Sequence, residues 1–162
     1  LCSFDAAILG AIYAKWIREA EHAGRISAAV EHDPDLPVHT AWDLGFSDST
    51  AIWWFQIAHR EVRLIDYYEA SGYGLHHYVG VLRQKPYSYG NHWGPHDIEV
   101  RELGTGKSRR EVCETQLGLK PIVVAPQLDL ESGIEQTRRI LPQCWFDETG
   151  CDIITLDING LG

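Results

Sequence analysis

The segment spanning residues 38–50, V-H-T-A-W-D-L-G-F-S-D-S-T, limits the possible fold more than any other part of the sequence. Its first eight residues alternate as in a β-strand, and the alternation places Asp43 on the face opposite Trp42 and Leu44. Strands are poor in aspartate, and a buried carboxylate needs a partner or a metal ion. Asp48 follows in a loop that can curl back towards the strand. The segment therefore predicts that Asp43 begins a metal site suited to phosphodiester cleavage.

Hydrophobic periodicity and turn residues predict alternating helices and strands along the rest of the chain. We expect helices at 3–23, 74–85, 108–117 and 130–141, and strands at 38–45, 50–58, 62–69, within 92–98, at 119–125 and at 144–147. The short link after residue 58 predicts an antiparallel hairpin, and Ser108 and Ser132 are expected to cap the last two helices. This order predicts an α/β fold with a mixed β-sheet, in which an antiparallel three-strand meander is joined by parallel strands and flanked by helices.

The composition is typical of one globular domain of ordinary size. A chain of 162 residues with 44% hydrophobic residues supports a sizeable core. Its apolar runs are too short for a membrane span, and its N-terminus lacks the features of a signal peptide. Four cysteines without a C-x-x-C pair predict free thiols in a reducing cytosol. The lack of any methionine, including an initiator, predicts that the chain is a fragment.

The net charge of -9 weakly disfavours a nucleic-acid partner, because phosphate binding favours lysine and arginine. The distribution of charge softens this conclusion, since residues 38–126 carry nine basic and ten acidic side chains and are close to neutral. The basic residues of this part gather at Arg101, Lys107, Arg109 and Arg110. We expect the start of the helix near residue 108 and the side chains of Lys107, Arg109 and Arg110 to contact DNA phosphates.

Asp43 and Asp97 form the leading candidate pair for metal binding. Both are expected at strand ends beside glycines, and a mixed sheet can bring two such ends together. Mg²⁺ prefers carboxylate oxygens, and two ions held in this way can activate water and stabilise a leaving oxygen. The alternative is that the two aspartates are unrelated turn or cap residues, because their spacing in the sequence specifies nothing.

Two other motifs have weaker functional interpretations. Residues 104–108, G-T-G-K-S, are similar to the tail of a phosphate-binding P-loop, but Arg101 stands where that pattern needs glycine. We therefore expect these residues to form a turn followed by a helix cap rather than an ATP-binding loop. His92 and His96 together with a cysteine could form a zinc site, although no paired cysteine motif accompanies them.

Four segments of this sequence resemble the large terminase subunit of tailed bacteriophages and prophages. They are S-F-D-A-A-I-L-G-A-I-Y-A (3–14), L-P-V-H-T-A-W-D-L-G-F-S-D-S-T-A-I (36–52), P-H-D (95–97) and G-T-G-K-S-R (104–109). The resemblance covers about residues 3–148, and D-L-G-x-x-D-x-T-x-I is its most specific part. It implies that residues 1–35 are the helix and linker at the end of an ATPase half, and that residues 36–162 form an RNase H-like nuclease domain, incomplete at its C-terminus.

The resemblance also implies an activity, namely metal-dependent cleavage of concatemeric double-stranded DNA during genome packaging. It places the catalytic and metal-binding acids at Asp43 and Asp97, gives Asp48 a supporting role, and implies Mg²⁺ or Mn²⁺ as cofactor. The partners that it implies are double-stranded DNA and, for the full-length protein, the portal protein and the small terminase subunit. It further implies a ring oligomer of the full-length protein in the cytoplasm of a bacterial host, with no membrane association.

The C-terminal end departs from the family pattern. The family places another acidic residue there, but the sequence after Glu148, T-G-C-D-I-I-T-L-D-I-N-G-L-G, does not match it. Neither Asp152 nor Asp157 sits in the expected motif, so we expect weak metal binding and reduced or absent cleavage. Two alternatives therefore stay open: a catalytically silent docking or DNA-contact module of the packaging motor, and another RNase H-like enzyme of the resolvase or transposase type.

Overall fold

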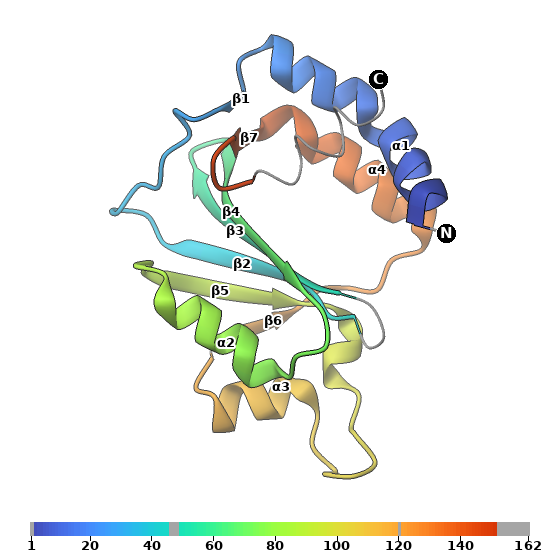
Figure 1. Ribbon diagram of the computed structural model, residues 1–162, viewed down its shortest axis with the longest axis vertical. Helices are drawn as coiled ribbons and strands as arrows, with labels where there is room; N and C mark the ends of the chain where they lie inside the picture. Colours follow the sequence, from blue (N-terminus) through green and yellow to red (C-terminus); the bar gives the residue numbers. More distant parts are fainter. Residues whose placement is uncertain (1, 46–48, 120, 152–162) are drawn as a thin grey trace. The chain divides into compact units, whose positions relative to one another are not determined.

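The computed structural model describes the backbone of residues 2–45, 49–119 and 121–151, and the side chains from residue 12 onwards within these ranges. Within these ranges, seven strands form one sheet in the order β1-β7-β4-β3-β2-β5-β6 (Figure 1). The strands are β1 (Ile26–Ser27), β2 (Val38–Asp43), β3 (Thr50–Ala58), β4 (Glu61–Ala70), β5 (Tyr89–Gly94), β6 (Ile122–Val124) and β7 (Cys144–Asp147). β2 pairs with β3 in antiparallel fashion, whereas β5 pairs in parallel with both β2 and β6. The predicted mixed sheet is therefore confirmed.

The helices flank this sheet. They are α1 (Cys2–His22), α2 (Leu75–Gln84), α3 (Arg109–Glu111) and α4 (Leu130–Ile140), the 3-10 helices η1 (His96–Glu99) and η3 (Leu141–Gln143), and the π-helix η2 (Val112–Gln116). None of the helices in the described ranges has both the length and the apolar character needed to cross a membrane.

The chain divides into two compact units, each of which has its own packing. Unit 1 comprises the described residues of Leu1–Asp33, Gln56–Tyr67 and Leu128–Gly162, and unit 2 those of Pro34–Phe55 and Tyr68–Gln127. The boundary between residues 35 and 36, which the resemblance to terminases implied, stays a prediction.

Unit 1 is built on a small apolar core around the last strand. Leu141, Cys144 and Phe146 form its buried centre, against which Tyr13, Trp16, Ile17, Ile26, Val62 and Leu64 pack. Arg25 follows the end of α1, and its guanidinium donates hydrogen bonds to the carbonyl oxygens of Leu141 at 2.9 Å and Cys144 at 2.7 Å. These bonds tie Arg25 to the transition from η3 to β7, where the Leu141 carbonyl oxygen also accepts the Cys144 amide.

The cap of α4 differs from the prediction. Asp129, rather than Ser132, precedes the helix, and its Oδ1 accepts a hydrogen bond from the Ser132 amide at 2.9 Å. The prediction of Ser132 as the cap was therefore wrong by three residues. Aspartate is as good an N-cap as serine, so the sequence alone left both positions open.

Unit 2 contains β2, β5, β6 and the helices between residues 75 and 116 (Figure 1). The predicted alternation of β2 is confirmed, because Val38 and Thr40 are fully buried and Leu44 is 8% exposed. Tyr78, Val79 and Leu82 form the buried face of α2. The predicted capping box is also confirmed: the Glu111 amide donates to Ser108 Oγ at 3.1 Å, and the Ser108 amide donates to the Glu111 carboxylate at 2.8 Å.

The helix that follows this capping box is not the regular helix that the sequence predicted up to residue 117. After one turn it widens into η2, where the Leu117 amide bonds to the Val112 carbonyl oxygen at 3.1 Å, five residues back. In the described residues, the strand predicted at 119–125 is β6, which spans Ile122–Val124 and pairs with β5.

Three cysteines of the described ranges, Cys113, Cys144 and Cys151, are buried and are not joined in disulfides. Burial raises the pKa of the Cys113 thiol and of the Cys144 thiol to about 11 each. The prediction of cysteines without disulfides is confirmed for these three residues.

Candidate functional site

Asp43 is the last residue of β2. Its backbone is held in register opposite Ala51 of β3, while its side chain is exposed. The neighbouring positions Thr40 and Leu44 belong to the buried face of the strand. The strand therefore fixes the position of the carboxylate and presents it to solvent, as its alternation predicted.

Asp97 lies in η1, which begins two residues after the end of β5. Gly94 leaves room for the Ile98 side chain, because a Cβ atom at this position would lie 2.7 Å from Ile98 Cδ1. Ile98 packs into this space and is 4% exposed, which anchors the turn. One carboxylate oxygen of Asp97, Oδ1, is buried and has no hydrogen-bond partner among the described residues. A buried carboxylate oxygen without a partner is costly, so Asp97 is a candidate ligand for a bound cation.

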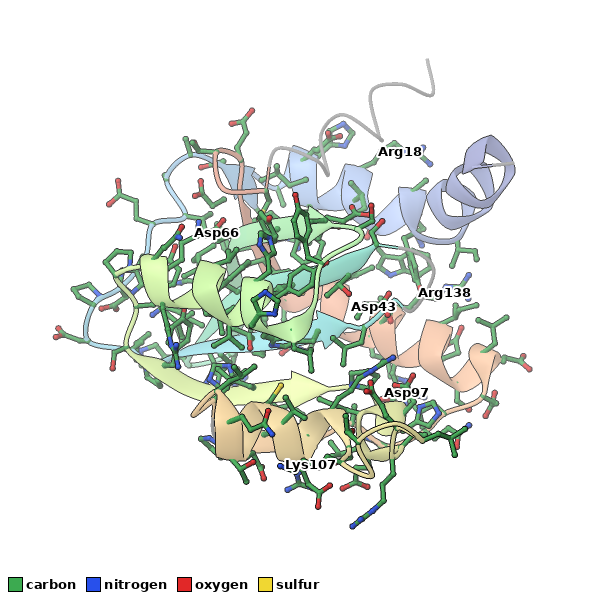
Figure 2. All side chains as sticks on the ribbon, turned by 60° about the horizontal axis from the view of Figure 1, so that its bottom comes forward. Arg18, Asp43, Asp66, Asp97, Lys107 and Arg138 are labelled. Carbon is green, nitrogen blue, oxygen red and sulfur yellow. The ribbon has the colours of Figure 1, made fainter. Side chains whose placement is uncertain are left out.

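The two aspartates belong to neighbouring parallel strands. In the register of β2 and β5, Thr40 is paired with His92 and Ala41 with Trp93, so both strands run towards the same edge of the sheet. Asp43 ends the first strand and Asp97 follows the end of the second, and Figure 2 shows both at this edge. Both residues therefore lie at the same edge of the sheet, as their expected positions at strand ends predicted.

The proposed supporting residue Asp48 lies outside the described residues. Within residues 2–45, 49–119 and 121–151, no group of three or more His, Cys, Asp or Glu side chains is arranged to hold a metal ion. The assignment of Asp43 and Asp97 as a metal-binding pair therefore stays a prediction.

The three basic residues expected to contact DNA differ in how closely carboxylates approach their side chains. Arg110 is engaged by two carboxylates, at 2.7 Å from Glu99 and 3.2 Å from Glu114. Arg109 Nε lies 3.7 Å from Glu102 Oε1. Lys107 is exposed and makes no side-chain ion pair with any described residue. Of the three, Lys107 has the charge most available for a phosphate group.

His92 is a buried polar residue beside this edge whose role the sequence did not indicate. It is 3% exposed, and its Nδ1 lies 2.8 Å from Thr40 Oγ1, which also accepts the indole N–H of Trp42 at 2.8 Å. Because Thr40 Oγ1 already accepts from Trp42, the consistent arrangement has the Thr40 hydroxyl donating to Nδ1 of a neutral imidazole. Burial, with a smaller contribution from the positive charge of nearby His39, lowers the pKa of His92 to about 4. The only sequence signal was the alternation that placed Thr40 on the buried face.

The residues of the P-loop and zinc interpretations serve the local fold instead. Residues 104–108 belong to a turn closed by a bridge between Arg101 and Ser108, and they lead into the capping box of α3. The buried His92 bonds to Thr40, whereas His96 is exposed, and the raised pKa of Cys113 keeps this thiol protonated at neutral pH. Neither motif forms a ligand site in the described part of the chain.

Comparison with known proteins places this arrangement in a structural context. No protein-family model matches the chain, and no curated protein matches it. The large terminase of a thermophilic bacteriophage superposes with a TM-score of 0.61 at 11% identity, over 83% of this chain and 35% of that one. The chain thus spans about a third of the length of that terminase.

Isolated nuclease domains match over most of their length. The nuclease domain of the P22 large terminase has a TM-score of 0.57 and 18% identity, and the match covers 83% of this chain and 73% of that domain. The large terminase nuclease domain of bacteriophage SPP1, solved with bound Mn, has a TM-score of 0.56 and 14% identity over 83% and 76% of the two chains. The chain therefore has the RNase H-like fold of terminase nuclease domains, the proteins that its sequence motifs resemble.

Proposed function

We propose that this chain is the nuclease domain of a viral DNA-packaging terminase and cleaves concatemeric double-stranded DNA with the help of Mg²⁺ or Mn²⁺. The observation that carries the proposal is the position of Asp43 and Asp97 at one edge of the sheet, with one oxygen of Asp97 buried and without a partner among the described residues. The shared fold supports it, as does the Mn bound to the SPP1 domain. In the full-length protein, the portal protein, the small subunit and a ring of copies in the host cytoplasm would complete the motor.

The residues present fit a divalent cation. Carboxylates are the ligands that Mg²⁺ and Mn²⁺ prefer, and a cation bound at Asp97 Oδ1 would satisfy the buried oxygen. When bound, such ions lower the pKa of a water molecule and stabilise the leaving oxygen of a phosphodiester. Asp97 would hold the cation from within the turn of η1, and the exposed Asp43 would face the approaching DNA strand. Asp48 is proposed to support the site from the neighbouring loop.

Replacing either aspartate by asparagine should abolish most DNA cleavage. We expect Asp43→Asn and Asp97→Asn each to lower the rate of plasmid nicking in Mn²⁺ by about 100-fold or more, because even outer partners of a metal site change affinity or activity by about 10- to 100-fold. Nicking of supercoiled plasmid by the purified chain, measured with and without EDTA, tests this.

The matched control is Asp35→Asn, because Asp35 is an exposed aspartate in the same unit that precedes β2, whereas Asp43 ends it. This variant should nick at the rate of the native chain. Equal nicking by the native chain and Asp43→Asn would contradict the catalytic assignment and favour the silent docking module.

Lys107 should contribute one electrostatic contact to DNA. Removal of a single phosphate contact lowers the slope of log affinity against log salt concentration by about 1, so Lys107→Ala should show this change on any duplex sequence. Fluorescence anisotropy of a labelled duplex in EDTA measures the slope. Lys15→Ala, which removes another exposed lysine, should leave the slope unchanged. An unchanged slope for Lys107→Ala would remove Lys107 from the DNA-binding surface.

A further inference from the structure

An open groove of about 490 Å³ lies in unit 2, and neither Asp43 nor Asp97 lines it. Its lining comes from Leu44 and Gly45 just after β2, from the loop and first turns of α2, and from residues of α3 and η2. Polar and apolar groups contribute to the lining, and pockets of about 300–1,000 Å³ are typical of small-molecule sites. The groove therefore has the size and mixed chemistry of a ligand site.

One wall of the groove is an aromatic ring that is already ordered. Tyr73 lines the groove and is 58% exposed, although its ring stacks on His77 with centroids 4.0 Å apart and planes only 13° from parallel. His77 is held in turn, because its Nε2 lies 2.9 Å from the hydroxyl of Tyr68. An exposed ring fixed in this way stacks on a flat apolar partner with little further loss of side-chain freedom. Nucleic-acid bases are such partners.

The opposite wall carries positive charge. Arg109 lines the groove with a side chain that is 19% exposed, and its Nε is 3.7 Å from a carboxylate oxygen of Glu102. The first turn of α2, which follows Gly74, also lines the groove and contains no acidic side chain. Both features favour an anionic group, whereas Glu102, which lines the groove as well, opposes it.

We propose that this groove binds one nucleotide unit, with its base on Tyr73 and its phosphate beside Arg109 and the first turn of α2. A free mononucleotide and a single-stranded DNA segment present the same chemistry. Glu102 limits the affinity, because its carboxylate competes with the phosphate for Arg109. The proposal holds whether or not the chain cleaves DNA, since the cleavage site is assigned to other residues.

Binding is tested without divalent metal, in EDTA, with a short fluorescein-labelled oligothymidylate as the probe. An abasic oligonucleotide of the same length serves as the control for base stacking. Thymidine 5′-monophosphate and thymidine are the competitors, and they differ only in the phosphate. If the monophosphate displaces the labelled probe and thymidine does not, the groove binds free nucleotides as well as single-stranded DNA. If only unlabelled oligothymidylate displaces the probe, the groove binds single-stranded DNA alone.

Three variants connect this binding to the groove. Tyr73→Ala should weaken binding of the probe about tenfold and bring it close to that of the abasic oligonucleotide, whereas Tyr73→Phe should retain it. Arg109→Gln should weaken binding about tenfold, because a charge-assisted contact to phosphate is lost. Glu102→Gln should strengthen binding about two- to fivefold, because the competing carboxylate is removed. A gain of affinity cannot result from damage to the fold.

Two results would overturn the proposal. The first is equal affinity of the native chain for the oligothymidylate and for the abasic oligonucleotide. The second is an unchanged or lower affinity of Glu102→Gln together with native binding by Tyr73→Ala. Neither result bears on plasmid nicking, so failure of this proposal and failure of the proposed nuclease are distinguished by separate measurements.

Discussion

Replacement of Gly150 by alanine should destabilise the protein more than a Gly→Ala substitution at any other described glycine. A Cβ atom at Gly150 would lie well under 3.0 Å from the backbone carbonyl oxygen of Ile65, a separation that real Cβ atoms essentially never show. Ile65 belongs to β4, which is held by pairing with β7 through Val62, Arg63 and Leu64. The oxygen therefore cannot move aside without distorting the strand.

The segment that carries Gly150 is itself fixed on both sides. The Gly150 carbonyl oxygen accepts the Tyr67 amide at 3.1 Å, and the Asp147 carboxylate accepts the amides of Thr149 at 3.1 Å and Gly150 at 3.2 Å. Because both neighbours are held, we expect Gly150→Ala to lower the free energy of unfolding by about 3 kcal/mol or more, at the upper end of overpacking effects. Urea unfolding followed by circular dichroism measures this change.

Gly133→Ala is the matched control. Gly133 lies inside α4 in the same unit, and a Cβ atom there would meet nothing within 4 Å. Alanine is a better helix former than glycine, so this variant should be more stable than the native chain by about 0.5–1 kcal/mol. If Gly150→Ala unfolded at the same urea concentration as the native chain, the packing of residues 147–151 on β4 would be refuted.

Acid should destabilise the fold through His92 between about pH 6.5 and pH 4. Since the pKa of His92 is about 4 in the folded chain and 6.5 for an ordinary histidine, the unfolded chain binds the extra proton first as the pH falls. Stability due to the neutral imidazole is therefore complete above about pH 6.5 and decreases towards pH 4. A difference of this size corresponds to roughly 3 kcal/mol, and the 3% exposure of His92 leaves little room for solvent screening.

The variant that isolates this effect is His92→Asn. Its side-chain oxygen can accept the Thr40 hydroxyl in place of Nδ1 but takes up no proton, so its free energy of unfolding should vary less with pH than that of the native chain. Other acidic groups affect both proteins alike, and the difference between the two curves reports His92. His59→Asn is the control, because His59 is exposed and asparagine tolerates its positive φ of 58°. Parallel curves for the native chain and His92→Asn would refute the role of the buried imidazole.

The sequence predicted those elements whose pattern is local. Alternation over residues 38–44 located the buried face of β2 and the exposed Asp43, and the capping box located the start of α3 at Ser108. The last strand, 144–147, was located to the residue because proline and a change of periodicity bound it. In each of these cases the deciding interactions lie within a few neighbouring residues.

Features set by distant contacts were not predictable in this way. The two-residue strand β1 is too short to show a periodicity. It forms because Ile26 and Ser27 pair with Phe146 and Asp147 of β7, more than a hundred positions later in the sequence. The burial of one unpartnered oxygen of Asp97 depends on tertiary packing, which no pattern in P-H-D-I reveals. The pair Asp43 and Asp97 was proposed from motifs, and only the parallel pairing of β2 with β5 gives a physical reason for it.

The three buried thiols have a consequence for following the opening of this protein. Burial raises the pKa of the Cys113 and Cys144 thiols to about 11, so both are almost entirely protonated at neutral pH, and only the thiolate reacts with an alkylating reagent. Cys113 belongs to unit 2, whereas Cys144 and Cys151 belong to unit 1. Mass spectrometry can follow the alkylation of each cysteine separately. The rate at which a given cysteine is modified then measures how often the unit around it unfolds locally.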